Sequence, residues 1–345
     1  AKIIAVTGSN GKTTVANMIY HLLNGELKNV EMAGNMGLSF AKSVAKINAD
    51  HYVLEISSFQ LDGIEKFKPH IAIITSITPD HLDRYDNDFD LYTASKFRIA
   101  ENQTEKDFLI YNADETHLCH WLKNNPVRST CIPISTEREL EFGTYLKDNQ
   151  IIINLDKKIT IMPISALEVE GKHNTKNAMA ASTVAHLLKI RKETIREKLE
   201  TFQGVEHRLE HVLKINNVNY INDSKATNVA AAIAAICGLE APVVLIAGGQ
   251  GKGQDFAPLA PVLAKTARAA VLYGQDAQRL AQVLADHIPV TVVDSLQSAS
   301  AQALAHSAPG DVILLAPACA SLDQFDNYQA RGECFRALVA EVANA

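Results

Sequence analysis

The sequence lacks the cysteine pattern of a protein held together by disulfides or by a structural zinc ion. Its 345 residues include five cysteines, which lie far apart and form no C-x-x-C pair. An odd number of scattered thiols does not fit a disulfide framework, and structural zinc sites need closer ligand spacing. We therefore expect reduced and mostly buried thiols, as in a cytoplasmic protein.

The sequence also lacks long hydrophobic runs and a strong excess of one charge. No apolar stretch approaches the ~20 residues of a transmembrane helix, and the start AKIIAVTG is too short for a signal peptide. The 33 basic residues stand against 39 acidic ones, which gives a net charge of −6. This balance does not favour nucleic acid or an anionic membrane as a partner. We expect neither kind of partner.

What is present is an ordinary globular composition, with 47% hydrophobic and 21% charged residues. At about 150 residues per domain, the length predicts two domains. In the first half, apolar runs predict strands at 2–7, 51–57 and 71–77, and apolar periodicity predicts helices at 13–24 and 174–190. Short strands between 127 and 164 suggest an antiparallel elaboration of the same domain.

A glycine and a polar turn lie near 202–210, and we place the boundary between domains 1–204 and 205–345 there. After this boundary the sequence again alternates strands and helices. Strands are predicted at 218–222, 243–247, 269–273, 290–293 and 312–316, and helices near 228–237, 257–266, 276–286, 297–307 and 328–343. Such alternation is typical of α/β folds with mainly parallel sheets. We predict two α/β units with mainly parallel sheets, the second of which resembles a nucleotide-binding fold.

The stretch TGSNGKTT, residues 7–14, has the residues of a phosphate-binding loop between a strand and a helix. Gly8 and Gly11 let the backbone curl so that successive N–H groups point at one anion. The helix N-terminus adds partial positive charge. Lys12 would neutralise the outer phosphates, and Thr13 or Thr14 would hold Mg²⁺.

The loop departs from the pattern G-x-x-x-x-G-K-[ST], because Val6 stands where its first glycine belongs. The alternative interpretation is an ordinary tight turn between a strand and a helix. A nucleotide site also needs an acidic metal ligand. Glu55 ends a predicted strand at the edge where open sheets bind ligands, and Asp80 and His81 follow the next strand. Carboxylate and imidazole suit Mg²⁺ only when phosphate oxygens and water share the site. Taken alone, His81 is interpreted as a capping or surface histidine.

A series of motifs, in this order, resembles the Mur ligase family. The motifs are TGSNGKTT (7–14), GNMGLS (34–39), YVLEISSFQL (52–61), TPDHLDRY (78–85), YTASKFR (92–98), HNTKN (173–177), HRLE (207–210), INDSKATN (221–228) and PACASLDQF (317–325). The resemblance covers essentially the whole sequence. DSKATN and ACASLDQF point to the members that add D-glutamate, and the D-N-P-R motif of the ligase that adds the third residue is absent.

The resemblance implies a central P-loop ATPase domain, a C-terminal Rossmann-like α/β domain and the activity of an ATP-dependent ligase of peptidoglycan precursor synthesis. We expect a cytoplasmic monomer that acts on small molecules. The carboxylate of UDP-N-acetylmuramoyl-L-alanine would take the γ-phosphoryl group of ATP, and the amino group of D-glutamate would attack the acyl phosphate. Members of the family carry a further N-terminal domain that holds the UDP end of the substrate. We therefore expect the sequence to be part of a longer protein. Another amide ligase, such as a folylpolyglutamate synthase, and a nucleotide-driven switch or motor ATPase are the alternatives.

The resemblance also implies residue roles. Nucleotide binding falls on Gly8, Asn10, Gly11, Lys12, Thr13, Thr14, Asn35, Asn177, Arg208 and Asp223. Two Mg²⁺ ions would be held by Thr13, Glu55, His81 and a carbamylated Lys96. Catalysis falls on Lys12, His81, Lys96 and Lys225, and binding of the other substrates on Ser57, Thr227, Lys252, Ser321, Leu322 and Tyr328.

Several of these residues also have plainer interpretations. Taken alone, Lys96 is a surface lysine on a helix, Asn177 a solvated amide, and NDSKATN a polar turn that caps a helix. The segment GGQGKGQDF, which contains Lys252, lacks the spacing G-x-G-x-x-G of a dinucleotide site. Tyr328 stands where the family often has phenylalanine, and Gln250 replaces an acidic residue of some relatives. Because ligand groups come from both domains, we expect a hinge near 203–208.

Overall fold

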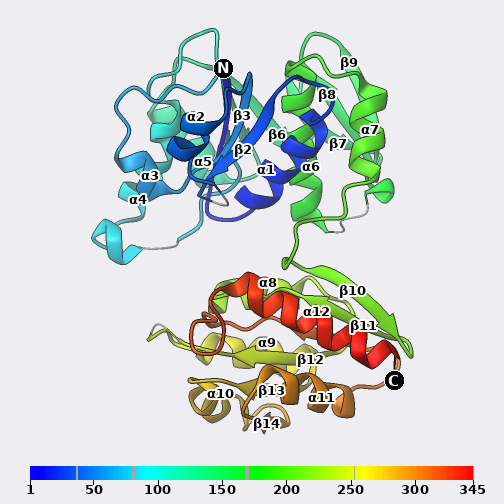
Figure 1. Ribbon diagram of the computed structural model, residues 1–345. Coiled ribbons are helices and arrows are strands. Elements are labelled where there is room, and N and C mark those ends of the chain that lie inside the picture. The colour runs from blue at the N-terminus through cyan, green and yellow to red at the C-terminus, as the bar shows by residue number, and fades with distance from the viewer. Residues whose placement is uncertain (36–37, 80–81, 168–170, 252, 345) are drawn as a thin grey trace. The chain divides into compact units, whose positions relative to one another are not determined.

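The computed structural model describes residues 1–35, 38–79, 82–167, 171–251 and 253–344 (Figure 1). The chain forms two compact units, Ala1–Gln203 and Gly204–Ala345. In both units a mainly parallel sheet carries the helices, which confirms the predicted α/β class.

The sheet of the first unit has, within the described residues, nine strands in the order β2-β3-β1-β4-β5-β6-β7-β8-β9. The strands are β1 (Lys2–Thr7), β2 (Val30–Gly34), β3 (His51–Glu55), β4 (Ile71–Ile74), β5 (Phe108–Asn112), β6 (Thr130–Ser135), β7 (Gly143–Lys147), β8 (Gln150–Asn154) and β9 (Lys158–Pro163). Neighbours from β2 to β7 are parallel, and β7, β8 and β9 are antiparallel. The predicted antiparallel elaboration is thus confirmed for β7–β9 and wrong for β6, which pairs in parallel with β5 and continues the main sheet.

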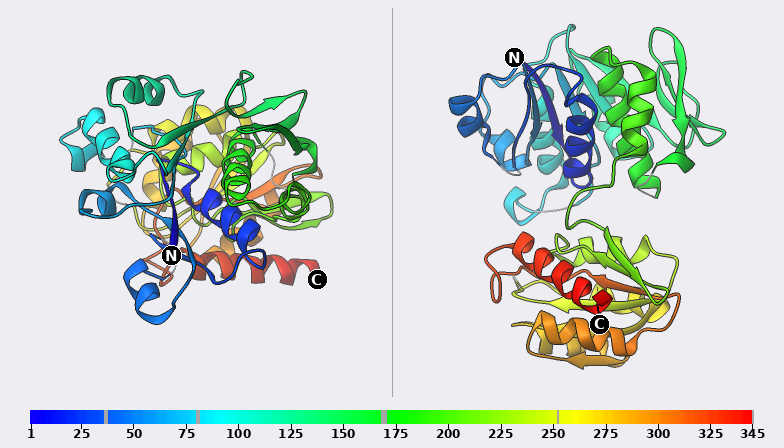
Figure 2. Two further views of the ribbon diagram at one scale, coloured as in Figure 1. Left: turned by 90° about the horizontal axis from the view of Figure 1, so that it is seen from above. Right: turned by 45° about the vertical axis from the view of Figure 1, so that its right-hand side comes forward.

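The helices of this unit are α1 (Lys12–Leu23), α2 (Phe40–Lys46), α3 (Ser58–Asp62), α4 (Phe89–Phe97), α5 (Thr116–Asn124), α6 (Lys172–Leu187) and α7 (Lys192–Glu200), with short 3₁₀ turns at Leu82–Tyr85, Arg98–Ala100 and Ile164–Ala166. The predicted apolar face of α1 is buried, with Val15, Ile19, Leu22 and Leu23 at most 1% exposed. Helices α1 and α6 lie side by side (Figures 1 and 2). This packing fixes the start of α1 beside the first turns of α6.

The sheet of the second unit has the order β10-β11-β15-β12-β13-β14. Its strands are β10 (Glu210–Ile215), β11 (Val218–Asn222), β12 (Val243–Gly248), β13 (Ala267–Tyr273), β14 (Val290–Val292) and β15 (Val312–Leu315). Its helices are α8 (Val229–Cys237), α9 (Ala260–Thr266), α10 (Ala277–Leu284), α11 (Leu296–His306) and α12 (Tyr328–Asn344), with a 3₁₀ turn at Ala257–Leu259. Neighbouring strands are parallel except β10, which runs antiparallel to β11.

Successive residues of β12 serve two separate cores of this unit. Leu245 packs in a core with residues of α8, α9 and α10, and Val244 and Ile246 pack in another with residues of α11 and α12. In a strand, successive side chains point to opposite faces, so helices cover both faces of the sheet. Helices α11 and α12 lie on the same face, as the right-hand view of Figure 2 shows.

Three observations differ from the sequence expectations or add to them. Strands β2, β5 and β10 were not predicted; β2 and β10 are edge strands with few buried residues.

All five cysteines are free, but Cys319 alone is buried, so the expectation of mostly buried thiols is wrong. In the described part of the chain, every helix is too short or too polar to cross a membrane.

Arg331 of α12 fastens two loops of the second unit to the helix. Its side chain is 0% exposed. It donates hydrogen bonds to Oγ of Ser224 at 2.9 Å, to the Ser224 carbonyl at 2.8 Å and to the Cys319 carbonyl at 3.2 Å. Burial lowers the pKa of the guanidinium. The loops after β11 and β15 therefore depend on one buried cation.

We predict that Arg331→Met lowers the free energy of unfolding by about 3 kcal/mol, because buried carbonyl oxygens lose their donors. The measurement is urea-induced unfolding followed by circular dichroism. The matched control is Arg196→Met: Arg196 is 55% exposed and pairs with Glu200 on the surface of α7. It should cost no more than about 0.5 kcal/mol. Equal effects of the two substitutions would contradict the structural role of Arg331.

Candidate active site

The loop after β1 has the backbone geometry of an anion-binding turn. Gly8 has φ 146° and Gly11 has φ 82°, values that side-chain-bearing residues rarely adopt. A Cβ at Gly8 would lie 2.0 Å from Oγ1 of Thr75, and one at Gly11 would lie 2.8 Å from Oδ1 of Asn177. Both glycines are thus favoured by conformation, and Gly8 is also required by space. The amide of Asn177, a predicted nucleotide contact, lies against the loop.

Residues after β4 hold this loop in place. The backbone N–H of Ser9 donates to the Ser76 carbonyl at 2.8 Å, and that of Asn10 donates to Oγ of Ser76 at 3.0 Å. Oγ of Ser9 donates to the Thr78 carbonyl at 2.8 Å and accepts from the Thr78 N–H at 2.9 Å. It also lies 2.9 Å from the hydroxyl of Tyr92 on α4. The loop is therefore rigidly connected to β4 and α4.

Two lysines converge on one carbonyl oxygen of the loop. Nζ of Lys12 donates to the carbonyls of Gly8 at 2.7 Å and Ser9 at 2.9 Å, and Nζ of Lys96 donates to the Gly8 carbonyl at 3.0 Å. The interpretation of Lys96 as a surface residue is wrong, since it is 2% exposed and lies 4.5 Å from the ring centroid of Tyr92. Helix α4 packs toward the loop, which turns this face of the helix inward. Two amino groups so close together favour an anionic ligand.

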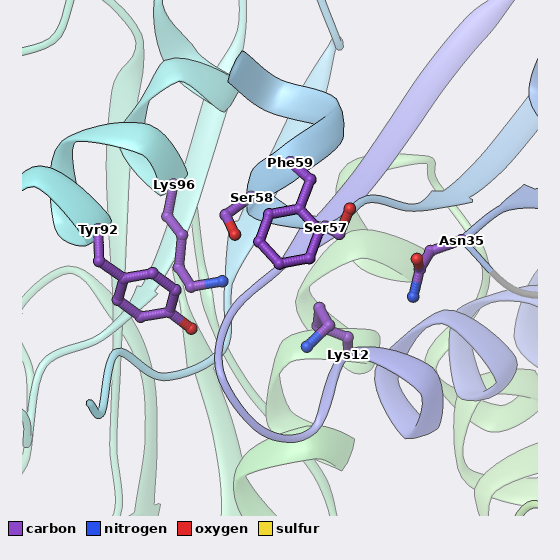
Figure 3. Close-up of a pocket in the computed structure, with 7 residues that line it drawn as sticks. All are labelled: Lys12, Asn35, Ser57, Ser58, Phe59, Tyr92 and Lys96. Atoms are coloured by element: carbon purple, nitrogen blue, oxygen red, sulfur yellow. The ribbon is translucent and has the colours of Figure 1, made fainter. Parts of the chain in front are cut away.

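The lysines line a pocket of ≈ 140 Å³, whose lining residues are Lys12, Asn35, Ser57, Ser58, Phe59, Tyr92 and Lys96. In Figure 3 the amino groups of Lys12 and Lys96 point toward one another across the pocket. Ser57 is the N-cap of α3, where its Oγ accepts from the Gln60 N–H at 3.3 Å. Predicted nucleotide, catalytic and substrate residues thus meet at this pocket.

Glu55 is buried at the end of β3 with half of its carboxylate unsatisfied. It is 3% exposed, and Oε1 accepts from Nδ2 of Asn35 at 3.0 Å. Among the described residues no donor reaches Oε2. An unpaired buried carboxylate oxygen is costly, so the site fits a cation. Thr13 and Thr14, 3% and 6% exposed, lie in the first turn of α1.

The described residues contain no group of three His, Cys, Asp or Glu side chains that could hold a metal alone. A Mg²⁺ ion here would need phosphate oxygens and water as further ligands. His81, the other predicted metal ligand, lies outside the described residues.

In the second unit, Asp223 directly follows β11 and lies in a buried and charged environment. Burial raises the pKa of Asp223 to about 6, although nearby Arg208, the Leu209 N–H and Lys225 act to lower it. The carboxyl group is 6% exposed. Arg208 and Asp223, both predicted nucleotide contacts, are therefore close, together with the predicted catalytic Lys225.

Of the residues predicted to bind D-glutamate, Thr227, Ser321 and Leu322 lie on loops of the same unit, and Tyr328 begins α12. Nζ of Lys225 lies 5.5 Å from the ring centroid of Tyr328, and the Thr227 N–H donates to the Lys225 carbonyl at 2.8 Å. Ser321 is buried and Leu322 is 64% exposed, both in the loop after β15. Strands β11 and β15 are parallel neighbours, so their following loops lie at one edge of the sheet. Lys252 lies outside the described residues.

The sequence analysis did not single out Tyr92, Ser58 or Phe59 as site residues. Tyr92 and Lys96 are four residues apart, which places both on one face of α4. That spacing was a usable signal. Nothing in the sequence pattern alone indicated that Phe59 faces the pocket or that Arg84 lies 4.1 Å from its ring centroid.

Comparisons with known proteins identify the family of the chain. Residues 6–185 match the Mur ligase middle domain, and residues 207–319 match the Mur ligase glutamate ligase domain. A UDP-N-acetylmuramoylalanine–D-glutamate ligase of Christiangramia forsetii is 52% identical over 339 residues, which cover 98% of this chain and 76% of the relative. The enzyme of the same name from Bacteroides fragilis is 39% identical over 345 residues, covering 99% and 77%.

Solved structures share the fold at lower identity. The MurF ligase of Thermotoga maritima in complex with ADP has a TM-score of 0.72 at 16% identity, covering 99% of this chain and 81% of that one. A pseudomurein peptide ligase type C from Methanothermus fervidus has a TM-score of 0.70 at 19% identity, covering 99% and 79%. With both domain types matched in order and a relative above half identity, this chain belongs to the Mur ligase family.

Proposed function

We propose that this protein is an ATP-dependent ligase that joins D-glutamate to UDP-N-acetylmuramoyl-L-alanine in the synthesis of peptidoglycan precursors. The name of the relative at 52% identity supports this substrate pair. The observation that carries the proposal is the pocket where Lys12 and Lys96 meet Asn35, whose amide holds the buried Glu55. A phosphate loop with two cations and a buried acid suits phosphoryl transfer to a carboxylate.

The reaction must replace a poor leaving group. The substrate carboxylate takes the γ-phosphoryl group of ATP, and ADP leaves. The neutral amino nitrogen of D-glutamate then attacks the acyl carbon. The nitrogen loses one proton to solvent as the amide bond forms, and phosphate leaves with the electrons of the broken C–O bond. The chain contributes position and charge: N–H groups at the start of α1 hold phosphate oxygens, and Lys12 neutralises negative charge on them.

Thr13, Glu55, His81 and a carbamylated Lys96 would hold Mg²⁺ in this proposal. The metal would neutralise phosphate charge when bound. The unsatisfied Oε2 of Glu55 supports a cation there. Addition of CO₂ to the neutral amine of Lys96 would give an anion, which relieves the cost of a buried ammonium group beside Lys12.

In the second unit, Arg208 and Asp223 would bind the nucleotide, and Lys225 would lie near the transferred phosphoryl group. D-glutamate carries two carboxylates. A lysine, hydroxyl groups and backbone N–H groups suit such a dianion. These groups would come from Thr227, Lys252, Ser321, Leu322 and Tyr328.

The decisive assay measures ADP formation by the purified protein with each substrate combination. We expect ADP to appear when ATP, UDP-N-acetylmuramoyl-L-alanine and D-glutamate are all present, and the amide product to appear in equal amount. L-Glutamate and other amino acids serve as controls. ADP formation at the same rate without D-glutamate, or a higher yield of amide product with another amino acid, would refute the proposed substrates.

We predict that Lys12→Ala lowers kcat for ADP formation at least 100-fold, since one charge at a reacting group contributes about 3–4 kcal/mol. The measurement is a coupled ADP assay at saturating substrates. Lys66→Ala is the control, because Lys66 is exposed and lies outside the pocket. A Lys12→Ala enzyme with more than one tenth of the original kcat would contradict the role of this lysine.

We predict that Asp223→Asn stabilises the protein while it weakens nucleotide binding. The pKa of Asp223 is raised to about 6 in the folded state, so ionisation penalises folding as pH rises from about 4 to 7. Asparagine lacks this penalty. The gain in unfolding free energy should grow over that interval to about 2–3 kcal/mol. Urea unfolding at several pH values measures it; a gain that does not vary with pH would contradict the assigned pKa.

A further inference from the structure

Helix α12 contains a glycine at a position where the helix alone would favour almost any other residue. Gly332 is buried and lies within Tyr328–Asn344, although glycine is a poor helix former. A Cβ at this position would lie 2.2 Å from Nδ1 of His207, 2.8 Å from Cγ and 2.9 Å from Cε1. The imidazole of His207 therefore occupies the space that a side chain at 332 would need.

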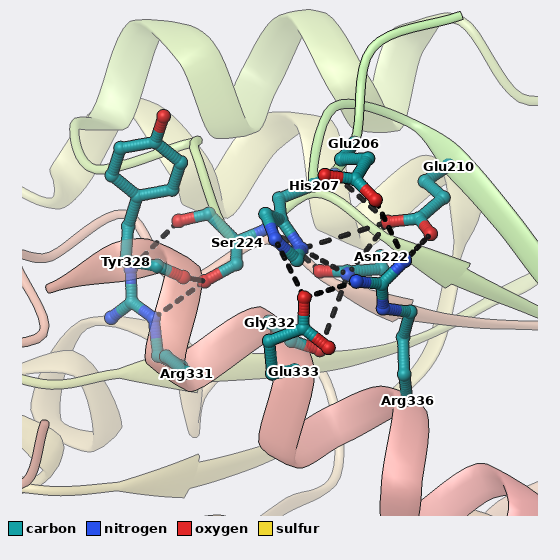
Figure 4. Close-up of polar contacts among 10 residues, drawn as sticks. All are labelled: Glu206, His207, Glu210, Asn222, Ser224, Tyr328, Arg331, Gly332, Glu333 and Arg336. Carbon is teal, nitrogen blue, oxygen red and sulfur yellow. Dashed lines mark hydrogen bonds and ion pairs between the residues drawn. The ribbon is translucent and has the colours of Figure 1, made fainter. Parts of the chain in front are cut away.

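The imidazole cannot move aside cheaply, because it is buried and hydrogen-bonded. His207 is 3% exposed, and Asn222, 0% exposed, donates from Nδ2 to its Nδ1 at 2.9 Å (Figure 4). The same amide nitrogen donates to Oε2 of Glu210 at 3.0 Å and faces the Gly332 carbonyl at 3.4 Å. An amide nitrogen can only donate, so Nδ1 of the ring accepts and Nε2 carries the proton. Nε2 lies 3.7 Å from the carboxylate of Glu333.

The backbone around this ring is held in an unusual conformation. His207 has φ 61° and Leu209 has φ 44°, on either side of Arg208. Residues other than glycine adopt such angles where the surrounding structure enforces them. The His207 N–H donates to Glu210 at 2.8 Å, and the His207 carbonyl accepts from the Lys225 N–H at 3.0 Å. The position of the ring is thus linked to the backbone that carries Arg208 and Lys225.

A second contact joins the same segment to α12. Arg336, one turn after Gly332, donates to Oε1 of Glu210 at 3.0 Å and pairs with Glu206 at 3.3 Å. The ring of His207 also packs edge-on against Tyr328 at 6.3 Å between centroids. The segment 204–210 is therefore fixed to α12 at three places, with the buried contact at Gly332 in the centre (Figure 4).

We infer that the His207–Gly332 contact positions Arg208 and Lys225 for the reaction. His207 is a positioning residue here: it acts through the backbone of its neighbours and through the Lys225 N–H. The inference rests on the proposed function for the roles of Arg208 and Lys225. Glycine at 332 admits the ring, and the ring fixes segment 204–210, which carries Arg208 and whose His207 carbonyl accepts from the Lys225 N–H.

The first test of the contact is a double-mutant cycle in thermal unfolding. Gly332→Ala should lower Tm by several degrees, because the new methyl group displaces the ring. In a His207→Ala background the same substitution should raise Tm or leave it unchanged, since the space is free and alanine favours the helix. An equal loss of Tm in both backgrounds would overturn the contact.

The second test measures directly whether segment 204–210 is held in place. In Gly332→Ala, hydrogen exchange should become at least tenfold faster for the amides of 204–210 and of Lys225, and stay unchanged in β12. The KM for ATP in the ligase assay should rise at least tenfold. Val339→Ala is the matched control: Val339 is 1% exposed in the same helix and should lower Tm without either change.

The outcomes separate the inference from the proposed function. A sign reversal in Tm with unchanged exchange and KM would overturn the positioning role. Wild-type protein without ligase activity would refute the proposed function, while Tm and hydrogen exchange would still decide whether the His207–Gly332 contact holds the loop.

Discussion

The first unit depends on the convergence of two lysine amino groups at the carbonyl oxygen of Gly8. Lys12 comes from the start of α1 and Lys96 from α4, and β1 lies between β3 and β4 in the sheet. The glycines allow the loop to curl there, and Ser9 anchors it to the segment after β4. Positive charge is thus concentrated at the end of a central strand. Phosphates are the ligands that best compensate it.

In the second unit, a helix holds the loops that carry the charged residues. Loops after parallel strands emerge at the same edge, but the sheet alone does not set their conformation. Helix α12 does this with adjacent residues: Arg331 binds carbonyls of the loops after β11 and β15, and Gly332 admits the ring of His207. Glycine destabilises an isolated helix, and a buried arginine destabilises a core. The contacts that Gly332 and Arg331 make with these loops explain why both residues are present.

Much of the fold could be predicted from the sequence because buried parallel strands give continuous apolar runs. The edge strands β2 and β10 escaped prediction, since exposed residues interrupt their apolar pattern. The loop after β1 could be identified as a candidate phosphate loop from TGSNGKTT. The burial of Lys96 could not be predicted, because a single lysine on a short helix looks solvated. The His207–Gly332 contact joins two residues whose numbers differ by 125. No local sequence pattern predicts such a contact.

The central claim is that the loop from Gly8 to Thr13 binds the phosphates of ATP between two lysines. A crystal structure of the protein with a non-hydrolysable ATP analogue and Mg²⁺ tests it most directly. The account predicts phosphate oxygens within hydrogen-bonding distance of the N–H groups at the start of α1 and of Nζ of Lys12, and metal density beside Glu55. Phosphates bound elsewhere, with Lys12 still paired to the Gly8 and Ser9 carbonyls, would contradict it.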